Sequence, residues 1–416
     1  MDAVASNHYR PRLSWLRSLA VGLAAASLVG GCTAAVASPS PMTSALVSPS
    51  VNSPSVNSPS LEPASPTPGP SAAAFTTLGV TSNWQGFSWS QLPSDNPLVT
   101  ADFDVQVLTW RGGYVAYGTR NGASSSFVWT SADGQTWTQV TSIIAPSVLV
   151  AVSPTGLVAM ARDLSATVPS ETVWTSSDGL QWRNAGPPAG VAFVDSIAGT
   201  STGLVAVEHT LTGSGKFATY QYNVVFSTDG MSWTPVTVDA GLSADIKVPQ
   251  VQSGKNRFFV LGAVRAGNAS GAVGVVWWSD DGRTWTRSSG TIGWPAISLD
   301  FGRDGILLHT NSMAVGGGGV GLALSTDGGK TWQPDDAFGP LGATVCGQGE
   351  CSVQPDGAIT SNGTVFVAVK SDGHAWVSYD GYTWTPIAWG GPASASGPLL
   401  VMPRGVLVGS AYGAAN

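Results

Sequence analysis

The sequence has few charged residues, few cysteines and no apolar run long enough to cross a membrane as a helix. Charged residues make up 10% of the 416 residues, against about 25% in typical soluble proteins. No cluster of Lys and Arg occurs beyond the first residues, so the chain lacks the electrostatic footprint of a nucleic-acid-binding protein. The formal net charge of −7 indicates a mildly acidic surface and points to no particular partner.

The most apolar segment, residues 19–29, has the length of a signal-peptide core rather than of a membrane-spanning helix. It follows three basic residues, Arg10, Arg12 and Arg17, and leads into Val29-Gly-Gly-Cys32. This ending resembles the lipobox of bacterial lipoproteins, which implies cleavage after residue 31 and a lipid on Cys32. The alternative is an ordinary signal peptide with an incidental cysteine.

A Ser/Pro-rich stretch follows the signal segment and contains the tandem Val51–Ser55 and Val56–Ser60. Alternating Ser and Pro cannot bury a core and favours extended, solvated chain. We therefore expect a signal peptide over 1–31, a disordered tether over 32–75 and a folded domain over 76–416. The domain would lie outside the cytoplasm, held at the bacterial cell envelope by the lipid on Cys32.

Only two other cysteines are present, Cys346 and Cys351. In an exported chain, two cysteines this close in sequence favour a disulfide that closes a small loop. The alternative, a metal site, needs further Cys or His nearby, and the sequence has none there. We expect neither a metal nor another cofactor.

Sustained helical periodicity is also missing. The chain instead repeats short, β-rich runs separated by turn residues, for example 105–111, 113–118, 126–130 and 136–140. Four such runs in each repeat predict a four-stranded antiparallel meander, the unit of a β-propeller blade.

Six copies of the motif Ser-x-Asp-Gly-x-x-Trp punctuate these runs, and the fifth copy carries one extra glycine. A spacing of about 50 residues indicates one repeated unit, as in a propeller or solenoid. The Asp can accept backbone N–H groups across a tight turn, the Gly supplies a positive φ, and the Trp can pack between neighbouring hairpins. The aspartates are Asp133, Asp178, Asp229, Asp281, Asp327 and Asp380, and the tryptophans are Trp137, Trp182, Trp233, Trp285, Trp332 and Trp384.

The motif resembles the Asp-box, or BNR repeat, named from bacterial neuraminidases. The resemblance covers about residues 76–416 and implies an all-β propeller whose Asp-box turns are structural, with any site on the opposite face. A decayed seventh copy at Gly86–Trp89 and two strand-like runs after Trp384 extend the count. We expect seven four-stranded blades, the last closed by two strands from each end of the domain.

Polar residues follow the second strand of each predicted blade, at the edge of the presumed binding face. Three arginines near a central funnel could bind a carboxylate or a sugar acid. The alternative is that polar residues simply occur wherever a strand runs into solvent. The candidate ligand-binding residues are Arg120, Arg162, His209, Arg265, His309, Lys370 and Tyr412.

The sequence lacks the residue set of a sialidase, because no Phe/Tyr-Arg-x-Pro motif occurs. We therefore expect a monomeric ligand-binding or scaffold protein whose partner is a glycan, peptide or protein. Similar propellers serve as ligand-binding domains in sortilin-type receptors and as assembly factors for photosystem II. One alternative is an exo-acting glycoside hydrolase of sialidase-like architecture, with Glu208 and Asp163 as candidate catalytic acids. Another is a purely structural envelope protein.

Overall fold

The structure is a computed structural model, in which the chain divides into two compact units, Met1–Ala73 and Ala74–Asn416. The described residues all belong to the second unit: 82–84, 87–94, 96, 98, 103–120, 126–163, 170–212, 219–238, 249–265, 272–290, 292, 295–311, 320–335, 339–347, 350–392, 399–402, 405–408 and 411–414. The predicted signal segment, Cys32 and tether lie outside them. No helix in the described part is long and apolar enough to cross a membrane.

The described elements are β-strands, with one short 3-10 helix, η3 (Gly339–Leu341). Six sheets have four antiparallel strands each. The first two are β2 (Phe103–Trp110), β3 (Gly113–Arg120), β4 (Ser126–Ser131) and β5 (Thr138–Ala145), then β6 (Ser147–Ser153), β7 (Gly156–Asp163), β8 (Ser170–Ser176) and β9 (Arg183–Gly186). The next two are β10 (Phe193–Thr200), β11 (Gly203–Thr212), β12 (Thr219–Ser227) and β13 (Thr234–Val236), then β14 (Gln250–Gly254), β15 (Arg257–Arg265), β16 (Ala272–Ser279) and β17 (Thr286–Arg287).

The remaining four-stranded sheets lie toward the C-terminus. One is β25 (Ala358–Ser361), β26 (Phe366–Val369), β27 (Ala375–Ser378) and β28 (Thr385–Ile387), and the other joins β29 (Leu399–Met402), β30 (Gly405–Val408) and β31 (Ala411–Ala414) to β1 (Ser88–Gln91). A five-stranded sheet holds β19 (Ala296–Phe301), β20 (Ile306–Asn311), β21 (Val320–Ser325), β22 (Thr331–Asp335) and β18 (Ser289–Gly290), and a separate hairpin pairs β23 (Gly342–Gly347) with β24 (Glu350–Pro355).

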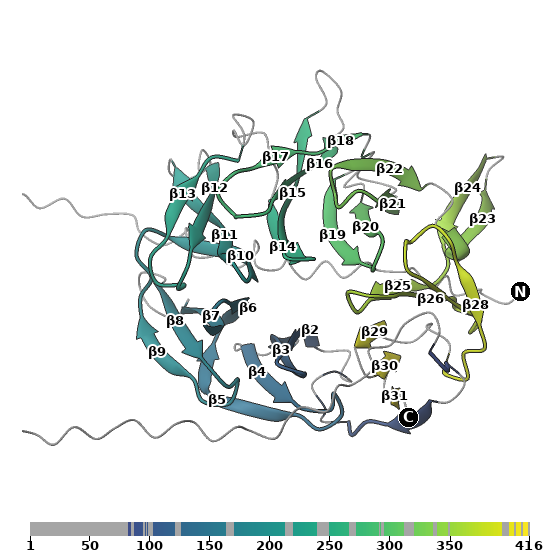
Figure 1. Ribbon diagram of the computed structural model, residues 1–416, viewed down its shortest axis with the longest axis horizontal. Helices are drawn as coiled ribbons and strands as arrows, with labels where there is room; N and C mark the ends of the chain where they lie inside the picture. Colours follow the sequence, from purple (N-terminus) through teal and green to yellow (C-terminus); the bar gives the residue numbers. More distant parts are fainter. Residues whose placement is uncertain are drawn as a thin grey trace, which may run out of the picture. The chain divides into compact units, whose positions relative to one another are not determined.

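The sheets follow one another around a ring with their first strands inward (Figure 1). The predicted all-β propeller of four-stranded antiparallel blades is therefore confirmed. The predicted number of such blades is wrong, because the described residues form six four-stranded blades rather than seven. The sheet between β14–β17 and β25–β28 has a fifth strand, β18, which runs parallel to β22.

The closing sheet also differs from the prediction. Three of its strands, β29, β30 and β31, come from the C-terminal end, and only β1 comes from the N-terminal end. The sequence after residue 409 reads as a tail, yet Ala411–Ala414 forms β31 between β30 and β1. Because β31 supplies the third strand, one N-terminal strand is enough to complete the sheet.

Strand β18 results from the path of the chain between two neighbouring sheets. After β17 the chain leaves its own sheet, and Ser289 and Gly290 pair with Thr331 and Trp332 of the next one. The same path recurs earlier, where Ala189 forms a parallel bridge with Ser232 and exchanges backbone hydrogen bonds with Met231 and Trp233. These crossings tie the outer edge of one sheet to the repeated motif of the next.

The core is divided among clusters that lie between adjacent sheets. Each cluster joins β-branched and aromatic residues of one sheet to those of its neighbour, as Phe258 and Val260 of β15 meet Val205 and Val207 of β11. The ring closes in the same way, because Leu407 of β30 packs with Tyr114 and Ala116 of β3. At the inner strands, side chains such as Gln252 Oε1 accept a backbone N–H of the next sheet, here from Leu299 at 2.7 Å.

Candidate functional site

The six repeated motifs form turns between the third and fourth strands, and their aspartates bond within their own turn. At the fourth copy, Asp281 Oδ1 accepts the backbone N–H groups of Arg283 and Thr284 at 2.8 and 2.7 Å and the Ser279 hydroxyl at 3.0 Å. The other five aspartates accept the equivalent bonds. The carboxylates are thus used to hold turns.

Burial alone would raise the pKa of Asp281, but the backbone N–H donors of Thr284 and Arg283 outweigh it and lower the pKa to about 2. The same balance lowers the pKa of Asp133, Asp229, Asp327 and Asp380. These aspartates stay ionised at neutral pH, which suits a turn acceptor and not a proton donor.

The extra glycine of the fifth copy alters one hydrogen bond. In the other five copies, the Trp indole Nε1 donates to the carbonyl of the motif Gly at 2.9–3.2 Å. Trp332 Nε1 is buried and has no partner in the described part of the chain. In this copy, the carbonyls of Gly328 and Gly329 accept hydrogen bonds from Arg257 and Ser288 instead.

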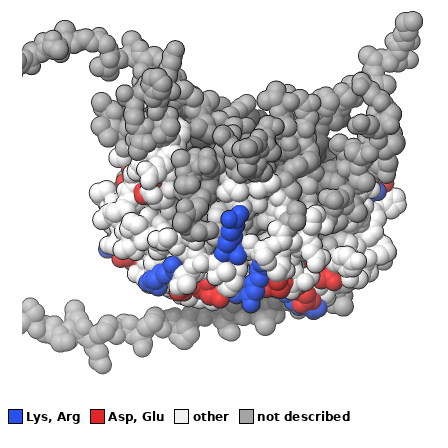
Figure 2. Space-filling view, turned by 90° about the horizontal axis from the view of Figure 1, so that it is seen from above, with Lys and Arg blue, Asp and Glu red and all other residues white. Residues whose placement is uncertain are grey.

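We call the sheet ends that carry these turns the box face and the opposite ends, with the second-to-third strand connections, the loop face. Charged side chains on the box face bridge neighbouring sheets. Arg111 Nη1 donates to the Ser177 carbonyl at 2.7 Å, and Arg257 Nη1 donates to the Gly328 carbonyl at 2.7 Å. Figure 2 shows the described basic and acidic side chains interspersed along the lower edge of that view.

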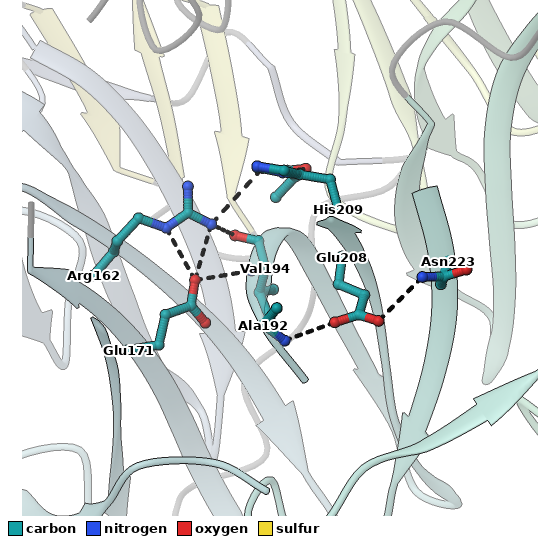
Figure 3. Close-up of polar contacts among 8 residues, drawn as sticks. Arg162, Glu171, Ala192, Val194, Glu208, His209 and Asn223 are labelled. Carbon is teal, nitrogen blue, oxygen red and sulfur yellow. Dashed lines mark hydrogen bonds and ion pairs between the residues drawn. The ribbon is translucent and has the colours of Figure 1, made fainter. Parts of the chain in front are cut away.

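A polar cluster lies on the loop face, where β7 and β8 meet β10 of the next sheet (Figure 3). Arg162 Nε donates to Glu171 Oε1 at 2.9 Å, and Nη2 donates to the Val194 carbonyl at 2.5 Å. The same Glu171 oxygen accepts the Val194 N–H at 2.8 Å. Glu171 has only 3% of its side chain exposed, so this ion pair is a buried link between two sheets.

A β-bulge brings Asp195 into this cluster. The pairing of β10 with β11 shifts between Val194 and Ser196, which leaves Asp195 as the extra residue. Its carboxylate contacts His209 Nδ1 at 2.5 Å through one oxygen and lies 3.7 Å from Arg162 Nη2 through the other. Asp195 therefore bridges the cation of one sheet and the imidazole of the next.

Aromatic rings surround the imidazole of His209. Phe193 stacks on it with ring centroids 5.4 Å apart, and Arg162 lies 5.5 Å from the Phe193 centroid. Tyr220 and Tyr222 approach the imidazole edge-on at 5.1 and 6.2 Å. Tyr220 remains 37% exposed and is the one exposed large apolar side chain on the loop face among the described residues, since Leu180 and Tyr382 lie in motif turns.

Two pKa shifts follow from this packing. Burial raises the pKa of Glu171, although Arg162 and the Val194 N–H oppose it, and Glu171 Oε2 has no hydrogen-bond partner in the described part. Burial, with the negative charge of Asp195 and the neighbouring Tyr220, raises the pKa of Tyr222 to about 12. The Tyr222 phenol thus keeps its proton at neutral pH.

The two predicted catalytic acids lie near the cluster in different roles. Glu208 is buried and accepts the Ala192 N–H at 2.7 Å and the Asn223 amide at 3.3 Å, which fixes the segment before β10 (Figure 3). Asp163 ends β7 and pairs with Ser170, the first residue of β8. Both Glu208 oxygens are engaged, so it has the contacts of a structural anchor.

The predicted ligand-binding residues are only partly brought together. Arg162 and His209 meet through Asp195, whereas His309 bonds to Asp300 at 2.8 Å two sheets further on. Lys370 follows β26, with its ammonium 5.9 Å from the Trp376 ring centroid. Arg120 and Arg265 end β3 and β15, but their side chains lie outside the described residues.

The structure corrects the prediction for Tyr412. The residue does not follow a second strand, because β30 ends at Val408 and Tyr412 lies within β31, opposite Ser90 and Leu407. Strand β31 was not predicted, because Ala411–Ala414 has little strand character.

Asp195 and Phe193 belong to the cluster but were not among the predicted site residues. Asp195 is an acidic residue just inside an inner strand, and this is the one signal in the sequence that could have marked it. Its orientation depends on the bulge, which strand periodicity does not reveal.

The other sequence predictions of sites remain predictions. Cys346 and Cys351 lie directly opposite each other in the β23–β24 hairpin, but their side chains are outside the described residues. Among the residues that are described, no group of three His, Cys, Asp or Glu side chains could hold a metal ion.

Residues 85–353 match the profile of the DUF6242 beta propeller domain, which is well over half of the chain. The chain belongs to the DUF6242 beta propeller family. The match includes the whole loop-face cluster of this DUF6242 protein, and no curated protein matches its sequence.

Solved structures with a similar chain path are distant. A GH32 beta-fructofuranosidase of Bombyx mori in complex with sucrose is 12% identical, with a TM-score of 0.32. The aligned region covers 58% of each chain. A thermostable family-43 glycoside hydrolase is 13% identical over 62% of this chain and 95% of its own, with a TM-score of 0.33. The GH43 endo-arabinanase from Bacillus licheniformis is 10% identical over 56% and 95%, with a TM-score of 0.30. The DUF6242 chain thus spans little more than half of the Bombyx enzyme, and these similarities concern the fold alone.

Proposed function

We propose that this protein is a ligand-binding protein of the bacterial cell envelope, anchored by a lipid on Cys32, which presents its loop face to a glycan, peptide or protein. The observation that carries the proposal is the cluster of Arg162, Asp195, His209 and Tyr220. It combines an exposed aromatic ring with polar groups held in place by neighbouring sheets. Such rigidly supported polar groups beside aromatic rings are typical of ligand sites.

The contrast between the two faces supports this assignment. The repeated aspartates accept hydrogen bonds from groups of their own turns, on the box face. The Asp-box resemblance assigns these turns the same structural role. A recognition function therefore belongs to the face where the sheets present dissimilar residues.

Binding of the purified full chain to isolated cell-envelope material tests the proposal. Co-sedimentation is measured for the wild type, for Tyr220→Ala on the loop face and for Tyr382→Ala on the box face. Tyr382 is 80% exposed in a motif turn, so it is a matched control of the same residue type. We expect Tyr220→Ala to lose binding and Tyr382→Ala to keep it. Loss with Tyr382→Ala alone would contradict the proposal.

The anchor is tested separately. Metabolic labelling with a radioactive fatty acid should mark the wild type and leave Cys32→Ser unlabelled. Labelling that persists in Cys32→Ser would exclude this residue as the lipid site, and an unlabelled wild type would favour the ordinary signal peptide.

One observation favours a second function, a glycoside hydrolase. Glu171 has a raised pKa and Asp195 lies against the same Arg162 Nη2, so two carboxyl groups with different environments occur together. Glycoside hydrolysis uses such a pair as acid and as nucleophile or base. Release of nitrophenol from a panel of aryl glycosides, reduced at least about 100-fold by both Glu171→Gln and Asp195→Asn, would establish the enzyme. If no aryl glycoside is hydrolysed, the ligand-binding function is retained and the hydrolase is rejected.

A further inference from the structure

The charged groups of the loop-face cluster are paired with one another. Arg162 Nε and Nη2 are occupied by Glu171 and the Val194 carbonyl, and Asp195 lies between Arg162 and His209. A ligand carboxylate placed beside Arg162 would therefore also face Asp195, and the two anions would repel each other. The arrangement is unsuited to a sugar acid, which the sequence analysis considered as the ligand of the arginines.

Several polar atoms of the cluster retain hydrogen-bonding capacity. When His209 Nδ1–H donates to Asp195, its Nε2 is left as an acceptor. In the described part of the chain, Arg162 Nη1 and the hydroxyls of Tyr220 and Tyr222 take part in no hydrogen bond. The set offers donors and acceptors in similar number, as a polyhydroxylated ligand requires.

The exposed ring of Tyr220 supplies the apolar part of the site. Tyr220 and Tyr222 stack with centroids 6.4 Å apart, and Tyr220 meets the imidazole edge-on, so its ring has little freedom to turn. A ring that is apolar on its face and polar at its tip suits a ligand with the same two characters. A pyranose has such a face of C–H bonds, edged by hydroxyls.

We propose that this cluster binds a neutral sugar residue of a glycan. The pyranose ring lies against Tyr220, and the hydroxyls of the sugar bond to His209 Nε2 and Arg162 Nη1. The inference rests on the proposed function and specifies its ligand class. Buried Glu171 positions Arg162, and the bulged Asp195 positions His209. These two carboxylates orient the polar groups of the site.

A glycan array probed with the full chain provides the first test. The array carries neutral oligosaccharides alongside glycans ending in sialic or uronic acids. We expect binding to a subset of the neutral glycans. The affinity should change little between about 50 and 500 mM salt, because salt screens the attraction of charged ligands and leaves neutral ones unaffected. Preferential binding to the acidic glycans, or binding to no glycan at all, would overturn the proposal.

Calorimetric titration with the strongest neutral oligosaccharide then tests the residues. Tyr220→Ala should weaken the affinity by about tenfold or more, as expected when an aromatic contact at a site centre is truncated. Asp195→Asn should also weaken it, because the imidazole loses its orienting charge, whereas Tyr382→Ala should match the wild type. Unchanged affinity in Tyr220→Ala would place the sugar elsewhere and overturn the proposal.

The outcomes separate this inference from the broader one. If Tyr220→Ala abolishes envelope binding but no glycan on the array binds, the loop face still holds a ligand site and the sugar proposal is refuted. Envelope binding that only Tyr382→Ala abolishes would refute both.

Discussion

At the scale of single residues, the repeated turns combine three kinds of hydrogen bond with one packing contact. The aspartate holds the turn, the serine holds the aspartate, and the indole N–H returns to the glycine carbonyl. Trp182, Trp233 and Trp332 are also buried against the preceding sheet. Each copy thus ties its own hairpin and fastens it to a neighbour.

Trp332 and Trp233 allow the indole hydrogen bond to be measured. Both are almost fully buried, but Trp233 Nε1 donates to the Gly230 carbonyl at 2.9 Å and Trp332 Nε1 has no partner among the described residues. Trp233→Phe should therefore cost about 1 kcal/mol more unfolding free energy than Trp332→Phe, the usual net value of a hydrogen bond. Urea unfolding measures both, and equal losses would contradict the role given to this bond.

Asp281 gives a prediction for pH. Its pKa falls from 3.8 to about 2 on folding, so its stabilising contribution is complete above pH 3.8 and disappears as the pH falls through about 2. The difference in unfolding free energy between wild type and Asp281→Asn should thus be present at pH 7 and shrink between pH 4 and 2. Because Asp281 is only partly buried, solvent screens its charge and we expect a small difference. A difference that grows in acid would show that the charge does not stabilise the turn.

At the scale of elements, the parallel strand β18 depends on a close approach of two backbones. Gly290 has φ 97°, and a Cβ there would lie 2.1 Å from the Trp332 carbonyl oxygen. Gly186 has nearly the same φ, 96°, but a Cβ there would meet nothing within 4 Å. The two glycines share a positive φ and differ in the room that a Cβ would find.

Alanine substitutions at Gly186 and Gly290 separate the cost of backbone strain from the cost of a steric clash between the Cβ and the neighbouring backbone. Gly186→Ala should cost about 1–2 kcal/mol, the usual penalty of a left-handed conformation for a residue with a Cβ. Gly290→Ala should cost clearly more, because β18 must also move away from β22. Thermal unfolding of both variants measures this, and equal costs would mean that β18 is not held to the next sheet.

The elements differ in how far the sequence could predict them. The alternating apolar runs and motif turns predicted the four-stranded meanders, since strand period and turn chemistry are local properties. Strand β31 was missed because Ala411–Ala414 has no alternating apolar pattern, and β18 was missed because its two residues pair only with another sheet. Arg162 and His209 were identified from their positions in the repeat, but their contact through Asp195 depends on a bulge and on packing between sheets.

At the scale of the whole molecule, the ring is closed by one strand from the N-terminal side. Trp89 of β1 packs edge-on against Trp389 with centroids 5.3 Å apart, and Trp84 stacks on the same indole at 6.5 Å. This aromatic group joins the closing sheet to the sheet of β25–β28. Without β1, the edge of β31 would be open to pairing with another chain.

Deletion of residues 82–92 from the full chain tests this closure. We expect a lower melting temperature and self-association, because the deletion exposes β31 and removes two of the three tryptophans. Light scattering and thermal melting measure the two effects. A deletion of equal length within residues 38–70 serves as the control and should change neither. A deleted protein that melts like the control would refute the shared sheet.

The pairing of β1 with β31 also fixes where the two ends of the folded domain lie. Ser88 lies directly opposite Ala414, so the two ends of the folded domain are neighbours across one ladder of hydrogen bonds. A short linker could join them, and new ends could be opened at Leu180, which is 57% exposed in a box-face turn. Such a circularly permuted domain should keep both the ring and the loop face, and it would release that face from any membrane anchor at the original N-terminus.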